Sequence, residues 1–146
     1  MDGLVQWLRA QLDKEAALAE AAGGDSWWWQ EHLSETVAVY DSKGDAVVYD
    51  EGRPTPEQQE HIATHDPARV LREIAAKRQL LDDYTVAARI RGEAVKRIMT
   101  AGDHLDSKDL EALDRAQREA AILEGPVKLA ALPFNDRPGY CEEWRP

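Results

Sequence analysis

The sequence predicts a mainly α-helical α+β fold, and three observations carry this prediction. Apolar residues recur at three-, four- and seven-residue steps over residues 67–100, as they do on one face of a long helix. Residues 27–50 are instead rich in aromatic and β-branched side chains, which is typical of short strands. The chain has 146 residues, 43% of them hydrophobic, which suits one compact domain with its own core. We therefore expect a single domain, 1–146, composed of segments 1–66, 67–125 and 126–146.

The first predicted helix covers residues 2–22. Asp2 can cap its N-terminus, and Gly23-Gly24 ends it. Trp7 lies at the edge of its apolar face, where a partly exposed indole is ordinary. The apolar positions of this helix are Leu4, Val5, Leu8, Leu12, Ala16 and Ala19.

A small antiparallel β-hairpin sheet is expected next, built from two or three strands. The turn Ser42-Lys43-Gly44-Asp45 joins ETVAVY to AVVYD, with Gly44 in the left-handed conformation. Trp27, Trp28 and Trp29 cannot all lie on one face of a strand, because successive side chains point in opposite directions. We expect one or two of these tryptophans in the core and at least one partly exposed, with Trp28 as a candidate interaction residue.

A short helix follows and ends at a corner. Thr55-Pro56-Glu57-Gln58 supplies an N-cap, a proline at the first helical position and a glutamine three residues after the cap. This helix should run to about His65. Pro67 then disfavours helical backbone at Asp66, so Asp66 should cap a new helix that begins with Pro67.

The central helix is expected to run from Pro67 to about Thr100. At about 50 Å it would exceed the diameter of about 40 Å that a compact chain of this size has. It should therefore bend or break near Thr85 or Gly92, or another chain should cover the excess. An antiparallel partner helix should start at Asp106 or Ser107 and end at Gly125-Pro126. Its predicted inner positions are Leu110, Leu113, Ala116, Ala120 and Leu123.

The C-terminal tail should be docked rather than free. It begins with a short apolar helix around Leu129 and Leu132 and becomes irregular at Pro133. Three large rings then occur in eleven residues, which favours burial against the body of the protein. These rings are Phe134, Tyr140 and Trp144, and we expect Trp144 to be the buried anchor.

Charge and cysteine content narrow the functional classes. The net charge is −10, but the segments 1–66, 67–100 and 101–146 carry −10, +4 and −4. An acidic surface repels nucleic-acid phosphates, so we do not expect nucleic acid as a partner, although such a surface can also mimic phosphates. Cys141 is the single cysteine, so no intrachain disulfide can form. Without an apolar run long enough for a bilayer, we expect a cytoplasmic protein with no membrane partner.

Two stretches carry a resemblance to a known group of proteins. HIATHDPARVLREIAAKRQLLD and ALPFNDRPGYCEEWRP resemble an uncharacterised domain-of-unknown-function family of short actinobacterial and actinophage proteins. The tryptophan run, the hairpin and the HIA-x-HDPA pattern also look like small phage accessory proteins. The resemblance covers 1–81 and 129–146 well and 82–128 poorly. It implies an actinobacterial or phage setting, and it implies no catalytic residue.

His61 and His65 form the one metal-like pair in the sequence. On a helix, their four-residue spacing places both imidazoles on one face, with His32, His104 and Asp66 as possible further ligands. The alternative is that His65 caps the carbonyls at the end of the helix, where the dipole favours a cation. No third ligand lies at a recognisable spacing, so we expect no metal or other cofactor.

The central helix carries the basic residues Arg69, Arg72, Lys77 and Arg78, which could contact phosphate. Pairing with carboxylates of the same chain is the simpler role for them. A nucleophilic Cys141 is disfavoured, because the adjacent Glu142 and Glu143 oppose a thiolate. No catalytic residue is assigned.

The main functional hypothesis is a non-catalytic protein that binds another protein, or a second copy of itself through 67–125. A dimer would cover the half of the central helix that its partner helix leaves bare. The alternatives are a zinc-binding or metal-dependent hydrolytic protein, and a nucleic-acid-associated accessory protein. The candidate interaction residues are Arg69, Arg72, Arg78, Trp28, Tyr84, Val95, Ile98 and Trp144.

Overall fold

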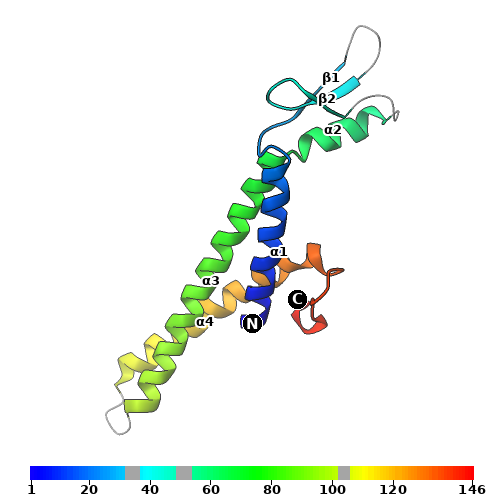
Figure 1. Ribbon diagram of the computed structural model, residues 1–146. Helices are drawn as coiled ribbons and strands as arrows, with labels where there is room; N and C mark the ends of the chain where they lie inside the picture. Colours follow the sequence, from blue (N-terminus) through cyan, green and yellow to red (C-terminus); the bar gives the residue numbers. More distant parts are fainter. Residues whose placement is uncertain (32–36, 49–53, 102–105) are drawn as a thin grey trace. The chain divides into compact units, whose positions relative to one another are not determined.

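The computed structural model describes residues 1–31, 37–48, 54–101 and 106–146 and confirms the mainly helical α+β class (Figure 1). A long helix and its partner accompany a three-stranded antiparallel sheet of order β1-β2-β3. The elements in chain order are α1 (Asp2–Ala21), β1 (Trp28–Glu31), β2 (Val37–Tyr40), β3 (Ala46–Val48), α2 (Pro56–Thr64), α3 (Pro67–Ala101), α4 (Ser107–Ala131) and the 3-10 turns η3 (Leu132–Phe134) and η4 (Glu142–Trp144).

The chain divides into two compact units, and the division falls within α1 and α3. Met1–Gln11 and Ala76–Pro146 form one unit, whose sequence holds 13 Lys/Arg and 14 Asp/Glu, a net charge of −1. Leu12–Ala75 forms the other, with 5 Lys/Arg and 14 Asp/Glu, a net charge of −9. We call them the neutral unit and the acidic unit. That both belong to a single domain stays a prediction.

The sheet of the acidic unit has the predicted hairpin. Trp28 pairs with Tyr40 and Trp29 with Val39 in a regular β1-β2 register, while the β2-β3 register shifts between Val39 and Tyr40. Gly44 adopts φ +85°, as the turn requires. The side chain of Val39 is completely buried. This strand therefore supplies the centre of the small core beside α2, which contacts β1 and β2.

The prediction for the tryptophan run is wrong in one respect. Trp28 and Trp29 are 42% and 45% exposed, and Trp27 is only half-buried. None of the three rings is a core residue. The β1 strand lies at the edge of the sheet, so among the described residues only one of its sides has a neighbouring strand.

Both predicted helix starts in the acidic unit are confirmed. At α2, Thr55 and Gln58 form a capping box in which each side chain accepts from the other residue's backbone N–H. At α3, the Oδ1 atom of Asp66 accepts from the backbone N–H of Arg69 at 2.6 Å. The Oδ2 atom of Asp66 also accepts from the backbone N–H of Trp27 at 3.4 Å, which ties the cap to the start of the sheet.

The helix α3 is continuous over 35 residues, so it does not break at Thr85 or at Gly92. Thr85 is accommodated because its hydroxyl donates to the carbonyl of Leu81 at 2.7 Å, within the same helix. In the neutral unit the end of α3 lies beside the start of α4, where Arg97 and Asp109 form an ion pair at 3.9 Å. Asp106 caps α4 through the backbone N–H of Lys108.

The predicted end of the partner helix at Gly125-Pro126 is wrong, because α4 continues to Ala131 with Pro126 inside it. The short separate helix expected around Leu129 and Leu132 is the last part of α4. An internal proline costs about 3 kcal/mol. Continuing α4 beyond Pro126 offsets this cost, because the residues after the proline extend the buried face of the helix. The buried residues of this face are Ala116, Ala120, Val127 and Ala131, whereas the predicted inner residue Leu110 is 50% exposed.

The C-terminal tail is docked on α1, as predicted, but the buried ring is Phe134 rather than Trp144. Phe134 is 6% exposed, with the guanidinium of Arg137 at 4.7 Å from its ring centroid. Trp144 is half-buried and belongs to a cluster with Trp7 and Tyr140, with ring centroids 5.5–5.8 Å apart.

Candidate interaction surfaces

His61 and His65 make a local cap at the end of α2. Their ring centroids lie 4.1 Å apart, and Nδ1 of His65 lies 2.9 Å from the carbonyl oxygen of His61. Because a carbonyl oxygen only accepts, this Nδ1 carries the hydrogen and is occupied at the end of α2. No group of three His, Cys, Asp or Glu side chains suited to a metal occurs among the described residues. His32 and His104, the proposed further ligands, lie outside them.

The predicted basic residues of α3 differ in their exposure and partners. The Nε atom of Arg69 donates to Glu73 at 2.9 Å, and its Nη1 atom donates to the carbonyl of Thr64 at 3.3 Å. Arg72 is exposed and Arg78 is half-buried. Arg69 and Arg72 belong to the acidic unit and Arg78 to the neutral unit. Their role in binding stays a prediction.

The predicted bare stripe on α3 is partly covered by the chain itself. Tyr84 is only 2% exposed, so the expectation that it lies on an open face is wrong. Burial raises the pKa of its phenol, and the nearby carboxylate of Glu124 acts in the same direction. Val95 is 37% exposed and Ile98 is half-buried. Sequence periodicity placed these residues on one face but could not show which neighbour covers it.

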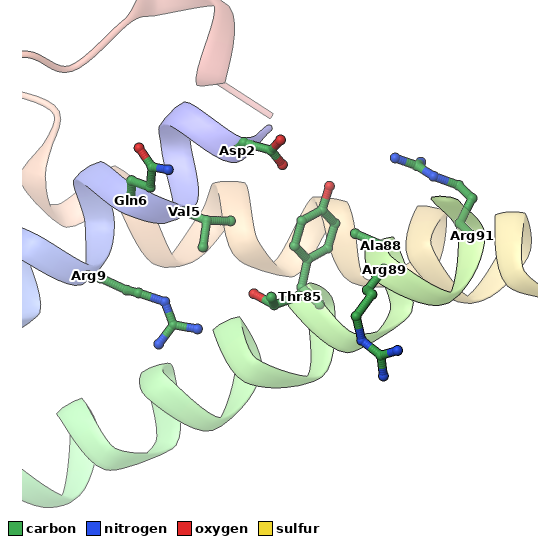
Figure 2. Close-up of a pocket in the computed structure, with 9 residues that line it drawn as sticks. Asp2, Val5, Gln6, Arg9, Thr85, Ala88, Arg89 and Arg91 are labelled. Carbon is green, nitrogen blue, oxygen red and sulfur yellow. The ribbon is translucent and has the colours of Figure 1, made fainter. Parts of the chain in front are cut away.

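A cavity of about 470 Å³ lies beside Tyr84 in the neutral unit, and nothing in the sequence pointed to it (Figure 2). Arg9 of α1 donates to Asp82 at 2.7 Å and Arg89 to Glu93 at 2.7 Å. Figure 2 also shows the side chains of Arg89 and Arg91 pointing in opposite directions. The guanidinium groups are therefore dispersed and partly neutralised, and they do not converge on an anion. The lining residues are Asp2, Val5, Gln6, Arg9, Tyr84, Thr85, Ala88, Arg89 and Arg91.

An apolar groove lies between α3 and α4, and we call it the α3/α4 groove. It has a volume of about 390 Å³ and is lined by Asp83, Val86, Ala87, Ile90, Glu119, Ile122 and Leu123. Val86, Ile90 and Ile122 are 48%, 40% and 71% exposed. Sequence reasoning missed these three residues, because they lie off the main apolar stripe. The only signal was the four-residue spacing of Val86 and Ile90.

Trp28, a predicted interaction residue, lies on the exposed surface of the sheet. Its ring stacks on that of Tyr40, its cross-strand partner, with centroids 6.1 Å apart and an interplanar angle of 28°. The neighbouring Trp29 points to the other face of the sheet and is equally exposed. The sheet therefore presents an indole on each face of the same strand.

Comparison with known protein families identifies the family of the chain. A family model described as a family of unknown function, DUF6221, matches residues 1–146. The chain belongs to this family. The match extends over residues 82–128, which the resemblance noted from sequence covered poorly. No curated protein and no solved structure matches this DUF6221 chain. Within the part of the chain that the structure describes, no helix is both long and apolar enough to cross a bilayer.

Proposed function

We propose that the chain is a non-catalytic protein-binding protein and that it binds through the α3/α4 groove. The observation that carries this proposal is the exposure of three large apolar side chains around a groove of about 390 Å³. Apolar side chains gathered on a surface, with polar residues at the rim, are typical of interaction sites. Asp83 and Glu119 provide such a rim.

The occupant that fits this surface is a second copy of the chain. A two-fold interface needs a patch that is complementary to itself, with a projection and a recess in the same area. Ile122 projects at 71% exposure, and the groove beside it is lined by Val86 and Ile90. In a two-fold arrangement, Ile122 of each copy enters the groove of the other.

Charge around the groove is consistent with this arrangement. Glu119 lies one turn of α4 from the exposed Arg115, and both line a shallow cavity of about 360 Å³ that shares Ile122 with the groove. A two-fold axis parallel to α4 keeps equivalent residues at the same height, so Arg115 of one copy lies within about one helical turn of Glu119 of the other. Opposite charges at an interface rim favour the correct orientation more than they add affinity.

Light scattering after gel filtration tests the proposal. At high micromolar concentration the wild-type chain should have twice its 16.4 kDa monomer mass. Ile122→Asp should be monomeric, because it places a carboxylate in an apolar contact. Leu129→Asp is the matched control, because Leu129 lies on the same helix and is 57% exposed but does not line the groove. It should remain a dimer.

A wild-type chain that is monomeric at this concentration would reject the second copy as occupant. Equal masses for Ile122→Asp and wild type, both dimeric, would show that the interface lies elsewhere. A charge test is independent of both. Glu119→Arg should weaken the dimer, and the double variant Glu119→Arg with Arg115→Glu should restore it.

A further inference from the structure

The strand β1 lies at an edge of its sheet and also contacts α2. One side of β1 is paired with β2 over four residues, and no strand pairs with its other side among the described residues. Edge strands usually carry lysine, proline or a bulge, because their free N–H and C=O groups otherwise accept another strand. The sequence of β1, WWQE, contains neither lysine nor proline, and the irregular register lies in the β2-β3 pair instead.

The tryptophans of β1 extend this edge on both faces of the sheet. Trp28 and Trp29 are 42% and 45% exposed, and their side chains point to opposite faces. The stack of Trp28 on Tyr40 holds one ring in place before any partner arrives. A strand added beside β1 would place its alternate side chains next to these rings, so it would bury apolar surface on both faces.

The charge of the acidic unit determines which kind of partner strand could bind beside β1. With a net charge of −9, this unit repels nucleic acid and also repels the same unit of a second copy. It attracts cationic segments, and this attraction accelerates their association. The side chains of lysine and arginine also suit exposed indole rings, on which they form cation–π contacts.

We propose that β1 docks an extended basic segment of a partner protein, which adds to the sheet as a further strand. Main-chain hydrogen bonds to β1 supply affinity, Trp28 and Trp29 receive alternate side chains, and the acidic surroundings select positive charge. The proposal concerns the acidic unit alone. It is independent of the α3/α4 groove and of dimer formation.

Three synthetic peptides test the proposal on the full-length chain. The probe alternates lysine with valine. The first control replaces lysine with glutamate, and the second keeps lysine but is N-methylated at every residue, so that it donates no backbone hydrogen bond. Tryptophan fluorescence gives the affinity, and hydrogen exchange reports on the β1 amides. The lysine peptide should bind and slow exchange in β1, and each control should bind about ten-fold more weakly or worse.

Two variants locate the binding edge. Trp29→Thr should weaken the lysine peptide about ten-fold, because an exposed aromatic anchor is removed while a strand-forming residue remains. Val47→Thr should leave the affinity unchanged, because Val47 is 41% exposed in the same sheet but belongs to β3. Matching circular dichroism spectra confirm that both variants fold.

Each alternative result overturns a defined step. No binding of the lysine peptide rejects the proposal, and equal binding of the N-methylated peptide rejects strand addition. Equal binding of the glutamate peptide, or binding of a single-stranded oligonucleotide, rejects selection by charge. Equal weakening in Val47→Thr and Trp29→Thr shows that β1 is not the edge used.

Discussion

The neutral unit and the acidic unit are stabilised by different kinds of interaction. The neutral unit buries two large rings, Tyr84 and Phe134, and joins Trp7 to the tail through the hydrogen bond from its Nε1 atom to the carbonyl of Pro138 at 3.1 Å. These contacts link residues far apart in the sequence. They show that aromatic residues help to join distant segments of this unit.

In the acidic unit, several side chains bind backbone groups only a few residues away. The capping box at Thr55, the cap at Asp66 and the turn in which Asp41 accepts from the backbone N–H groups of Lys43 and Asp45 are all of this kind. Its tryptophans are largely exposed. Three predictions test this contrast.

The largest effect is expected from Phe134→Ala in the neutral unit. Removing this buried ring leaves a cavity in the neutral unit and should lower the free energy of unfolding by about 3–5 kcal/mol. Urea denaturation measures the change. Leu129→Ala is the control, and because Leu129 is 57% exposed it should lose less than about 1 kcal/mol. Similar losses in both variants would show that Phe134 does not anchor the tail.

A smaller effect is expected at the corner of the acidic unit. Asp66→Ala removes the cap of α3 and should lower the free energy of unfolding by about 1 kcal/mol. Asp66→Asn keeps an acceptor for the backbone N–H of Arg69 and should recover most of that loss. Pro67→Ala should change little, since the first helical position needs no donor. If Pro67→Ala lowers the free energy of unfolding most of the three, the proline ring rather than the Asp66 cap determines where α3 begins.

The smallest effect is a pH dependence that belongs to the neutral unit. The pKa of Tyr84 is raised in the folded state by burial, so folding favours its protonated form. Its contribution to stability is therefore complete below the ordinary tyrosine pKa of about 10 and is lost as the pH rises above that value. Tyr84→Phe should lose less stability than wild type between neutral and strongly alkaline pH. Identical alkaline losses in chemical denaturation would contradict the buried state of this phenol.

Sequence reasoning succeeded most in the acidic unit. The hairpin turn with Gly44, the capping box and the Asp66-Pro67 corner all follow from signals within four residues of one another, and all are present. It failed at the tryptophan run, because strand alternation indicates which face a ring is on but not whether that face is covered. Of the candidate interaction residues, Trp28 is exposed and Tyr84 is not.

In the neutral unit, sequence reasoning found the helices but misjudged where they end and what covers them. Gly125-Pro126 is a typical stop signal, yet α4 continues because Val127 and Ala131 gain burial on the same face. The α3/α4 groove was missed altogether. Val86 and Ile122 are ordinary exposed residues in their own helices, and they form a groove only because the two helices lie together.

The sequence alone determined the class of fold, the order of the elements, the helix caps and the excess of acidic residues in the first half of the chain. Each of these depends on local backbone chemistry or on composition. Only the tertiary structure decided that Phe134 rather than Trp144 is enclosed, that Tyr84 is covered, and that Trp28 and Trp29 are exposed on an edge strand. Burial is a property of the neighbours that a side chain acquires on folding, and those neighbours come from distant parts of the chain.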